Sequence, residues 1–199
     1  MASSQYFDPS PASASRRRSS RVALPDTSFD LITESGVFSA DGLDTGTRLL
    51  LLEAPAPAAD GDLLDLGCGA GPIAVVLGRR SPDAQVWAID VNERARALCR
   101  DNATATGAAN VRVCAPDEVP DGVRFSTIWS NPPIRIGKAA LHDLLQRWLN
   151  RLTDDGVAVL VVQKHLGADS LATWLQTEGW QVDRLRSRAG FRLLVVRRT

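Results

Sequence analysis

Asn131, Pro132 and Pro133, in the segment WSNPPIR, place polar groups on a rigid frame. Consecutive prolines stiffen the backbone and remove two N–H donors, and a proline pushes the residue before it out of helical geometry. The segment therefore offers two fixed acceptors, the side-chain oxygen of Asn131 and the carbonyl of Pro132. Such acceptors orient the N–H bonds of an amine attached to an sp² carbon and favour its charge-gaining form. We interpret the corner as a holder for such an amine; the alternative is a stiff loop in which Asn131 only caps the following segment.

A glycine-rich turn, LLDLGCGAGPIA, is the second group of residues suited to chemistry. Its glycines are Gly67, Gly69 and Gly71. Without side chains, this backbone lets a ligand approach closely, and the helix that follows offers free N–H groups. Asp65 precedes the first glycine, and Asp90 ends the next apolar segment, where an acid accepts both hydroxyls of a ribose. Because Ala74 stands where a dinucleotide fingerprint has its third glycine, the turn favours a smaller adenosine-bearing ligand.

Alternating strands and helices are expected to position both groups. The predicted strands are 62–67, 84–90, 110–115, 123–130, 156–165, 180–187 and 191–198, and the predicted helices are 71–80, 92–107, 138–152 and 168–179. This alternation predicts an α/β fold with a mostly parallel seven-stranded sheet and helices on both faces. The last two strands are predicted to form an antiparallel hairpin at one edge of the sheet.

The N-terminal region differs in composition from the rest of the chain. Residues 1–20 are rich in Ser, Pro and Arg and are predicted to form a flexible tail. Residues 21–60 contain two extended pieces, the segment SGVFSADGLDTGT and a short helix that Pro55 and Pro57 end, and we assign them to an extension that covers the ligand. The main domain is predicted over 61–199.

The overall composition is that of an ordinary globular domain. The chain has 199 residues, a formal net charge of +0 and 44% hydrophobic residues. It has no apolar stretch long enough to span a membrane, and its start lacks the apolar middle of a secretory signal. Cys68, Cys99 and Cys114 are odd in number and widely spaced, which indicates reduced thiols in a cytoplasmic protein, with neither disulfides nor a metal site.

Nearly all positive charge comes from arginine, in two clusters. One contains Arg16, Arg17, Arg18 and Arg21, and the other contains Arg184, Arg186, Arg188, Arg192, Arg197 and Arg198. Arginine suits contact with phosphate, so the clusters are candidates for an RNA-binding surface. The alternative is a solvated surface in an arginine-biased proteome.

The motifs DLGCGAG and NPPIR, together with Asp90, resemble those of class I S-adenosylmethionine-dependent methyltransferases with a Rossmann-like fold. More narrowly, the chain is similar to the small-domain (MTS) methyltransferases that modify the guanine N2 amine in ribosomal RNA. The segment SGVFSADGLDTGT looks like the cofactor-covering stretch of that subgroup. The resemblance extends from about Tyr6 to the C-terminus. Many of these enzymes carry an additional N-terminal copy of the fold, which this sequence does not include.

The resemblance implies roles for individual residues. The catalytic residues would be Asn131, Pro132 and Pro133; S-adenosylmethionine would be bound by Asp65, Gly67, Gly69, Gly71, Asp90, Val91, Asp117, Asn131, Phe38 and Thr47; and substrate would contact Ile134 and Arg135. Asp117 would accept the adenine amine, and Phe38 and Thr47 would close over the methionine end. No metal is implied. Family members usually carry an aromatic residue after the second proline to stack on a flipped base, and Ile134 departs from that pattern.

Three hypotheses follow for function. The first is methyl transfer from S-adenosylmethionine to an exocyclic base amine of RNA, with guanine N2 in ribosomal RNA or a ribosomal subunit as the expected target. The second is a protein-glutamine N5 methyltransferase, which uses the same corner but normally follows it with tyrosine and carries a helical N-terminal domain. The third is an inactive methyltransferase fold that binds RNA, against which the intact Gly67, Asp90 and Asn131 argue.

Overall fold

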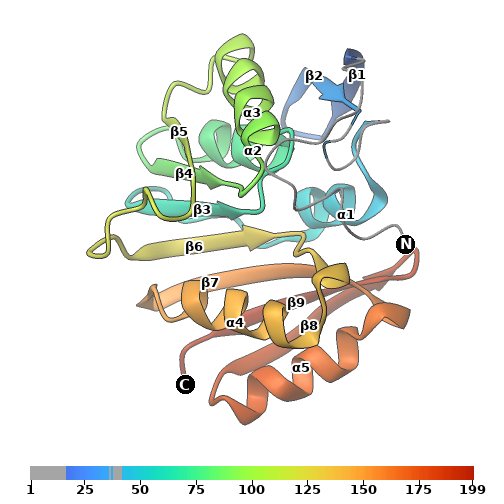
Figure 1. Ribbon diagram of the computed structural model, residues 1–199, viewed down its shortest axis with the longest axis vertical. Helices are drawn as coiled ribbons and strands as arrows, with labels where there is room; N and C mark the ends of the chain where they lie inside the picture. Colours follow the sequence, from blue (N-terminus) through green and yellow to red (C-terminus); the bar gives the residue numbers. More distant parts are fainter. Residues whose placement is uncertain (1–16, 36, 38–41) are drawn as a thin grey trace.

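A seven-stranded mixed sheet organises the chain, as seen in a computed structural model that describes residues 17–35, 37 and 42–199 (Figure 1). Its strands are β3 (Asp62–Leu66), β4 (Gln85–Ile89), β5 (Val111–Cys114), β6 (Phe125–Ser130), β7 (Leu152–Gln163), β8 (Gln181–Arg188) and β9 (Phe191–Arg197). They run in the order β5-β4-β3-β6-β7-β9-β8. The first five strands in this order are parallel to one another, whereas β9 pairs antiparallel with both β7 and β8. The predicted seven-stranded sheet with a C-terminal antiparallel hairpin is confirmed.

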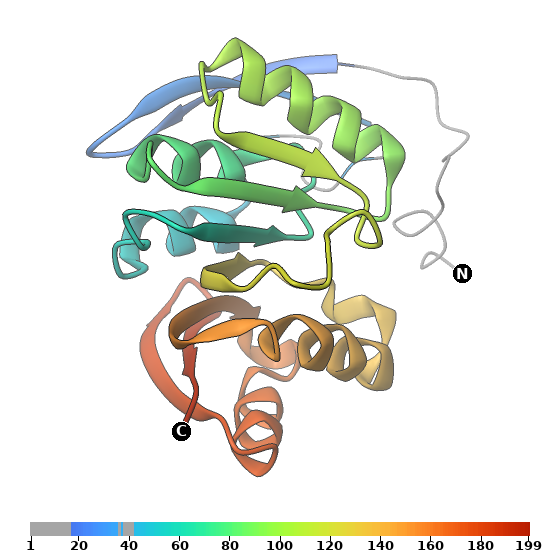
Figure 2. The same cartoon turned by 90° about the vertical axis from the view of Figure 1, so that its left-hand side faces the viewer.

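Helices cover both faces of this sheet (Figures 1 and 2). The helices α1 (Thr45–Glu53), α2 (Pro72–Arg80) and α3 (Glu93–Ala105) share one hydrophobic cluster with sheet residues such as Leu63 and Val86. The helices α4 (Lys138–Leu149) and α5 (Ala168–Thr177) share the other cluster with Leu64 and Trp87. Successive residues of a strand thus enter opposite cores, as expected for a parallel sheet buried on both faces.

Two predicted boundaries around α4 and β7 were wrong. The helix predicted over 138–152 ends at Leu149, and Leu152 instead begins β7, where it pairs with Phe125 of β6. Sheet pairing therefore overrides the helical periodicity of the apolar residues. At its other end β7 stops at Gln163, and Lys164–Leu166 form a short 3-10 helix, η2.

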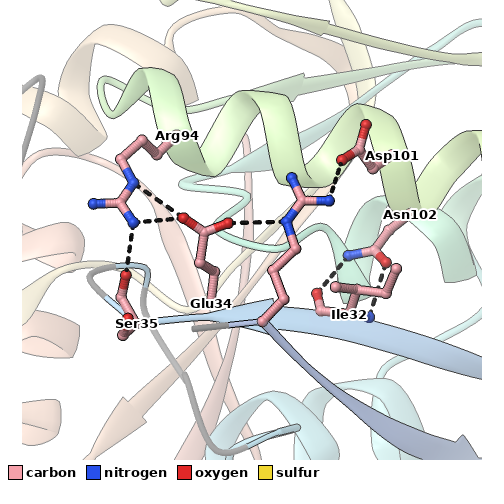
Figure 3. Close-up of polar contacts among 7 residues, drawn as sticks. Ile32, Glu34, Ser35, Arg94, Asp101 and Asn102 are labelled. Atoms are coloured by element: carbon pink, nitrogen blue, oxygen red, sulfur yellow. Dashed lines mark hydrogen bonds and ion pairs between the residues drawn. The ribbon is translucent and has the colours of Figure 1, made fainter. Parts of the chain in front are cut away.

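The predicted N-terminal tail was too long. Strand β1 begins at Arg17 and extends to Ala23, so residues 17–20 belong to an antiparallel pair with β2 (Ser28–Glu34). Arg17 ties this strand to the rest of the fold, because it forms ion pairs with Glu34 (3.2 Å) and with Asp101 of α3 (3.0 Å). Figure 3 shows Glu34 held between two guanidinium groups, the second from Arg94. The rest of the predicted tail lies outside the described residues.

Asn102 ties the same hairpin to the glycine turn. This fully buried side chain accepts a hydrogen bond from the backbone N–H of Ile32 (2.9 Å) and donates to the carbonyls of Ile32 (2.8 Å) and Ala70 (2.8 Å). Ala70 belongs to the glycine turn, and Figure 3 shows the two bonds to Ile32. The amide therefore fixes the edge of β2 and the turn relative to each other through α3.

Candidate active site

A cavity of about 450 Å³ opens at the carboxyl ends of β3, β4, β6 and β7, where parallel α/β sheets bind ligands. We call it the main cavity. It is lined by Asp44, Leu66, Gly67, Ile89, Asp90, Val91, Pro116, Asn131, Pro132, Pro133, Ile134, Arg135, Ile136, Ala140, Leu144, Gln163, Leu166 and Phe191. The glycine turn and the NPP corner, far apart in the sequence, thus meet in one space.

A minor cavity of about 20 Å³ adjoins these residues on the side of the N-terminal extension. It shares Asp44, Gly67 and Asn131 with the main cavity and also touches Thr47 and Gly69. The extension therefore contributes to the walls around the glycine turn. Its role as a cover for a cofactor stays a prediction.

The three glycines of the turn serve different purposes. All have a positive φ, between 54° and 86°, which favours residues without a Cβ. A Cβ on Gly71 would lie 2.5 Å from the sulfur of Cys99, so this glycine allows α2 and α3 to pack. A Cβ on Gly67 would meet nothing within 4 Å, and Gly67 lines the main cavity. Of the three, Gly67 has the position expected for contact with a ligand.

Asp90 is oriented by the backbone around it. One carboxylate oxygen accepts from the N–H of Gly69 (3.0 Å) and the other from the N–H of Asn92 (2.9 Å). Burial raises the pKa of Asp90, while these two bonds oppose the rise. Each oxygen keeps a further lone pair, and the residue lines the main cavity beside Val91, which is 53% exposed. This geometry suits recognition of a pair of ligand hydroxyls.

Asp65 lies beneath the turn and lines neither cavity. It is fully buried, and one of its oxygens accepts from the N–H of Ala74 at the start of α2 (2.9 Å). Its other oxygen, Oδ1, has no hydrogen-bond partner in the described part of the chain. Burial raises the pKa of Asp65 from its ordinary 3.8 to about 8. Asp65 therefore supports the turn in this structure, and its contact with a ligand stays a prediction.

The NPP corner is an inverse γ-turn. Pro133 has φ −75° and ψ 77°, and the carbonyl of Pro132 accepts from the N–H of Ile134 (2.8 Å). The turn fixes the direction of this carbonyl and uses one of its two lone pairs, and its role as an acceptor for a target amine stays a prediction. Pro132 is buried, whereas Pro133 and Ile134 are half-buried and line the main cavity.

Asn131 is held by helix α1. Its side-chain nitrogen donates to both carboxylate oxygens of Asp44 (3.2 and 3.3 Å) and to the hydroxyl of Thr47 (3.1 Å). The carboxylate oxygens of Asp44 can only accept hydrogen bonds, so the nitrogen of the amide must face them. This fixes the orientation of the Asn131 amide. The amide oxygen forms no hydrogen bond within the described residues and stays available as an acceptor.

Asp44 was missed by the sequence analysis, although a signal was present. Asp44 caps the N-terminus of α1, because its carboxylate accepts from the N–H groups of Gly46 (2.9 Å) and Thr47 (3.2 Å). An aspartate directly before a helical apolar run is a recognised helix start. What the sequence does not reveal is that the same carboxylate reaches the Asn131 amide, 87 positions away.

The other predicted residues are distributed unevenly. Arg135 is exposed and lines the main cavity, whereas Asp117 is exposed and does not line it. Pro116, next to Asp117, does line it. Phe38 lies outside the described residues. The individual roles of these residues stay predictions.

Gln163, Leu166 and Phe191 also line the main cavity, although the sequence analysis did not select them. Gln163 ends β7 and Phe191 begins β9, so the antiparallel return of the chain brings them together. No local motif marks either residue. Their position follows only from the strand order.

Acidic side chains of the chain itself pair with the two arginine clusters. The arginines in ion pairs are Arg17, Arg21, Arg184, Arg186, Arg188, Arg192, Arg197 and Arg198. Some partners, such as Glu53 for Arg186, come from segments distant in the sequence, whereas Asp30 lies nine positions from Arg21. This pairing favours the interpretation of both clusters as solvated surface. Arg16 lies outside the described residues.

Cys68, Cys99 and Cys114 are all free and buried. Residues 17–35, 37 and 42–199 contain no cluster of three or more His, Cys, Asp or Glu side chains arranged to hold a metal ion. In the same part of the chain, no helix combines the length and apolarity needed to cross a membrane.

Comparison with known proteins gives three results. The family model for the methyltransferase small domain matches residues 28–195. A Bacillus subtilis relative, uncharacterized protein YbxB, is 33% identical over 96% of this chain and 97% of its own length. Ribosomal RNA small subunit methyltransferase C of Shewanella amazonensis is 35% identical over 73% of this chain, which corresponds to 43% of that relative.

A solved structure shares the fold. It is the T. thermophilus 16S rRNA N2 G1207 methyltransferase in complex with AdoMet and guanosine, with a TM-score of 0.75 and 22% identity. The match covers 96% of this chain and 52% of that one. The chain therefore spans about half the length of the ribosomal RNA methyltransferases that it matches.

Proposed function

The chain belongs to the methyltransferase small domain family, an S-adenosylmethionine-dependent methyltransferase family, and from this premise we propose that it methylates the exocyclic N2 amine of a guanine in ribosomal RNA. The observation that carries the proposal is the amide of Asn131. Its nitrogen is engaged by Asp44 and Thr47, and its oxygen is left as an acceptor in a cavity shared with Gly67 and Asp90.

The residues around the glycine turn fit S-adenosylmethionine. Asp90 would hold the ribose hydroxyls, and Val91 and Pro116 provide apolar surface for an adenine beside it. Gly67 leaves open space where a side chain would otherwise stand. Asp65 lies below the turn, where it accepts a hydrogen bond from the N–H of Ala74 and so supports the start of α2. When bound, S-adenosylmethionine supplies an electrophilic methyl group.

The NPP corner would bind and orient the amine that receives the methyl group. The oxygen of Asn131 and the free lone pair of the Pro132 carbonyl would accept from the two N–H bonds of the target amine. This directs the nitrogen lone pair towards the methyl group, and positioning of this kind supplies about 7–11 kcal/mol of a barrier. As the new N–C bond formed, the bond from the methyl carbon to the sulfonium sulfur would break and leave a neutral thioether, so positive charge would pass to the nitrogen and strengthen both hydrogen bonds. The proton leaves the methylated nitrogen for solvent afterwards, so no strong base is needed.

The choice of guanine and of ribosomal RNA is supported by the relatives. One relative is named a ribosomal RNA small subunit methyltransferase, and the structural neighbour is described as acting on N2 of a guanine and as binding guanosine. An exocyclic amine on an aromatic ring poses the chemical problem that the corner addresses. A ribosomal RNA substrate would place the reaction in the cytoplasm.

The rim of the main cavity supports an RNA partner. Arg135, Lys138 and Lys164, which we call the rim cations, are exposed on or beside the segments that line this cavity. Within the described part of the chain, none of the three forms an ion pair. They are therefore available for phosphate contact, unlike the paired arginines.

The test is mass spectrometry of nucleosides from ribosomal RNA incubated with the protein and isotope-labelled S-adenosylmethionine. The expected product is labelled N2-methylguanosine, absent with Asn131→Ala. Label in another nucleoside would overturn the choice of base. Label in a glutamine side chain of added protein, with none in RNA, would establish the second hypothesis instead.

A further inference from the structure

The corner lacks a feature that a base-binding site needs. A base removed from an RNA stack loses its stacking energy and is usually held against an aromatic ring. The residues after the second proline are Ile134 and Arg135, and Ile134 offers only apolar contact. Another part of the chain must therefore supply an aromatic surface if a base enters the main cavity.

Phe191 is the one aromatic side chain among the described residues that line this cavity. It is half-buried at the start of β9, directly after the turn from β8. The backbone fixes this position, because the carbonyl of Gly190 accepts from the N–H of Lys164 (2.8 Å) and so closes the end of the β7–β9 pair.

Gln163 stands beside Phe191. The two residues are directly opposite in the antiparallel register of β7 and β9, so their side chains leave the sheet on the same face. Gln163 lines the main cavity, and its amide forms no hydrogen bond within the described residues. A half-buried amide without partners offers one acceptor and two N–H donors to a ligand.

Helix α1 connects this pair to the corner. A Cβ on Gly46 would lie 2.7 Å from a ring carbon of Phe191, so the ring packs against the helix backbone at this glycine. The neighbours Asp44 and Thr47 hold the amide of Asn131. The segment Asp44–Thr47 therefore determines the positions of both the Phe191 ring and the Asn131 amide.

We propose that Phe191 and Gln163 form the subsite for the target base, with the ring of Phe191 as its stacking surface and the amide of Gln163 at its polar edge. The inference rests on the proposed function, which places an aromatic amine at Asn131. Phe191 would thus take the role that an aromatic residue at position 134 would otherwise have, although it lies nearly 60 positions further along the chain.

The experiment uses 2-aminopurine riboside, a fluorescent purine whose amine occupies the position of the guanine N2 amine. Protein saturated with S-adenosylhomocysteine is titrated into the probe, and stacking on an aromatic ring quenches the fluorescence. Phe191→Leu should weaken binding about tenfold, within the range for loss of one base–aromatic stack. Phe191→Tyr keeps the ring and should bind like wild type. Gln163→Leu should weaken binding about two- to tenfold, because the hydrogen bonds of the amide are removed.

The matched control is Trp174→Leu. Trp174 is a half-buried aromatic residue on α5 that stacks on His142 (ring centroids 3.6 Å apart), outside the main cavity. Its replacement should leave probe affinity unchanged. Calorimetry with S-adenosylhomocysteine and thermal unfolding check that each variant is folded and loaded. If Phe191→Leu unfolds, Phe191→Met replaces it, because methionine fills the space of the ring with a flexible chain that has no aromatic face.

The outcomes separate the two proposals. Equal probe affinity for wild type and folded Phe191→Leu, or no quenching by wild type, overturns the subsite whatever the RNA result. Quenching that depends on Phe191, with no label in any RNA, supports the subsite and contradicts the ribosomal RNA target. If Phe191→Tyr binds the probe as weakly as Phe191→Leu, then the Phe191 side chain only packs against α1 and does not stack on the base. This result would also overturn the subsite.

Discussion

The two halves of the main cavity are built in different ways. The half that we propose to bind the cofactor, here called the cofactor half (Gly67, Asp90 and Val91), comes from two consecutive strand ends within 25 positions of sequence. The half that we propose to bind the target base, here called the target half (Asp44, Asn131, Gln163 and Phe191), is assembled from four segments spread over nearly 150 positions. A site made of backbone and one acid is compact in sequence, whereas a site for a particular base needs side chains collected by the whole fold.

The halves also differ in how their polar groups are satisfied. Both oxygens of Asp90 already accept backbone N–H groups, so its orientation is set before any ligand binds. In the target half, the oxygen of Asn131 and the amide of Gln163 have no partner within the described residues. The cofactor half is therefore internally bonded, while the target half presents free groups to its ligand.

The largest effect is expected in the target half. Asn131→Ala should lower the rate of methyl transfer by about 10²–10³, as for loss of one preorganised polar group. Affinity for S-adenosylmethionine should change little, because Asp90 and Gly67 are untouched. The measurement is single-turnover methyl transfer to ribosomal RNA at saturating cofactor. Asn150→Ala, at the exposed end of α4, is the matched control.

Asn131→Asp sharpens this test. It would place a second carboxylate where the amide nitrogen now lies 3.2 Å from Asp44, so repulsion should disturb the corner although an acceptor remains. A wild-type rate for Asn131→Ala would mean that the corner is structural and that the acceptors lie elsewhere at this edge of the sheet.

In the cofactor half, Asp90→Ala should weaken binding of S-adenosylmethionine by about 1–3 kcal/mol, the scale for removal of hydrogen bonds to a charged group. Calorimetry measures the change, with the exposed Asp83→Ala as the control. At saturating cofactor the methyl-transfer rate should recover most of its wild-type value. A rate as low as that of Asn131→Ala under these conditions would show that the two halves are not separable.

The difference between the halves explains which parts were predictable. Strand and helix order followed from apolar periodicity, and the glycine turn and NPP corner were recognisable because each is a local motif. The hydrogen bonds from Asn131 to Asp44 depend on tertiary packing, which no local motif reveals. The pairing of Gln163 with Phe191 depends on the register of β7 and β9. For Asp65, the sequence pattern gives the position before the turn but not the direction of the side chain, which is buried.

Asp65 gives the cofactor half a pH dependence of its own. The unfolded chain releases this proton near its ordinary pKa of 3.8, whereas the folded chain keeps it up to about 8. The free energy of unfolding should therefore fall as pH rises through this window, by at most about 1.4 kcal/mol per pH unit. Asp65→Asn, which cannot ionise, should remove this contribution. Chemical denaturation of both proteins below, within and above the window measures it, and parallel pH profiles would contradict the assignment.

The smallest effects concern RNA affinity outside the cavity. Replacing Lys138 or Lys164 by alanine should reduce the slope of log affinity against log salt by about 0.7 for each phosphate of single-stranded RNA that the variant no longer neutralises. Arg21→Ala and Arg197→Ala are the controls, since both side chains already pair with carboxylates (3.2 and 3.0 Å). Filter binding to ribosomal RNA over a salt series measures the slope. An unchanged slope for the lysine variants, with a reduced slope for the arginine variants, would move the RNA path to the arginine clusters.

Strand β8 has a consequence for the behaviour of the chain in concentrated solution. It is an edge strand, with β9 as its one partner in the described structure, and an open edge invites pairing with another copy and aggregation. Along this edge Asp183, Arg184, Arg186 and Arg188 are exposed. A second molecule that added a strand here would have to bury these charged groups. The exposed arginines of β8 (Arg184, Arg186 and Arg188) therefore disfavour edge-to-edge association of the sheet. This contribution to solubility requires no nucleic acid.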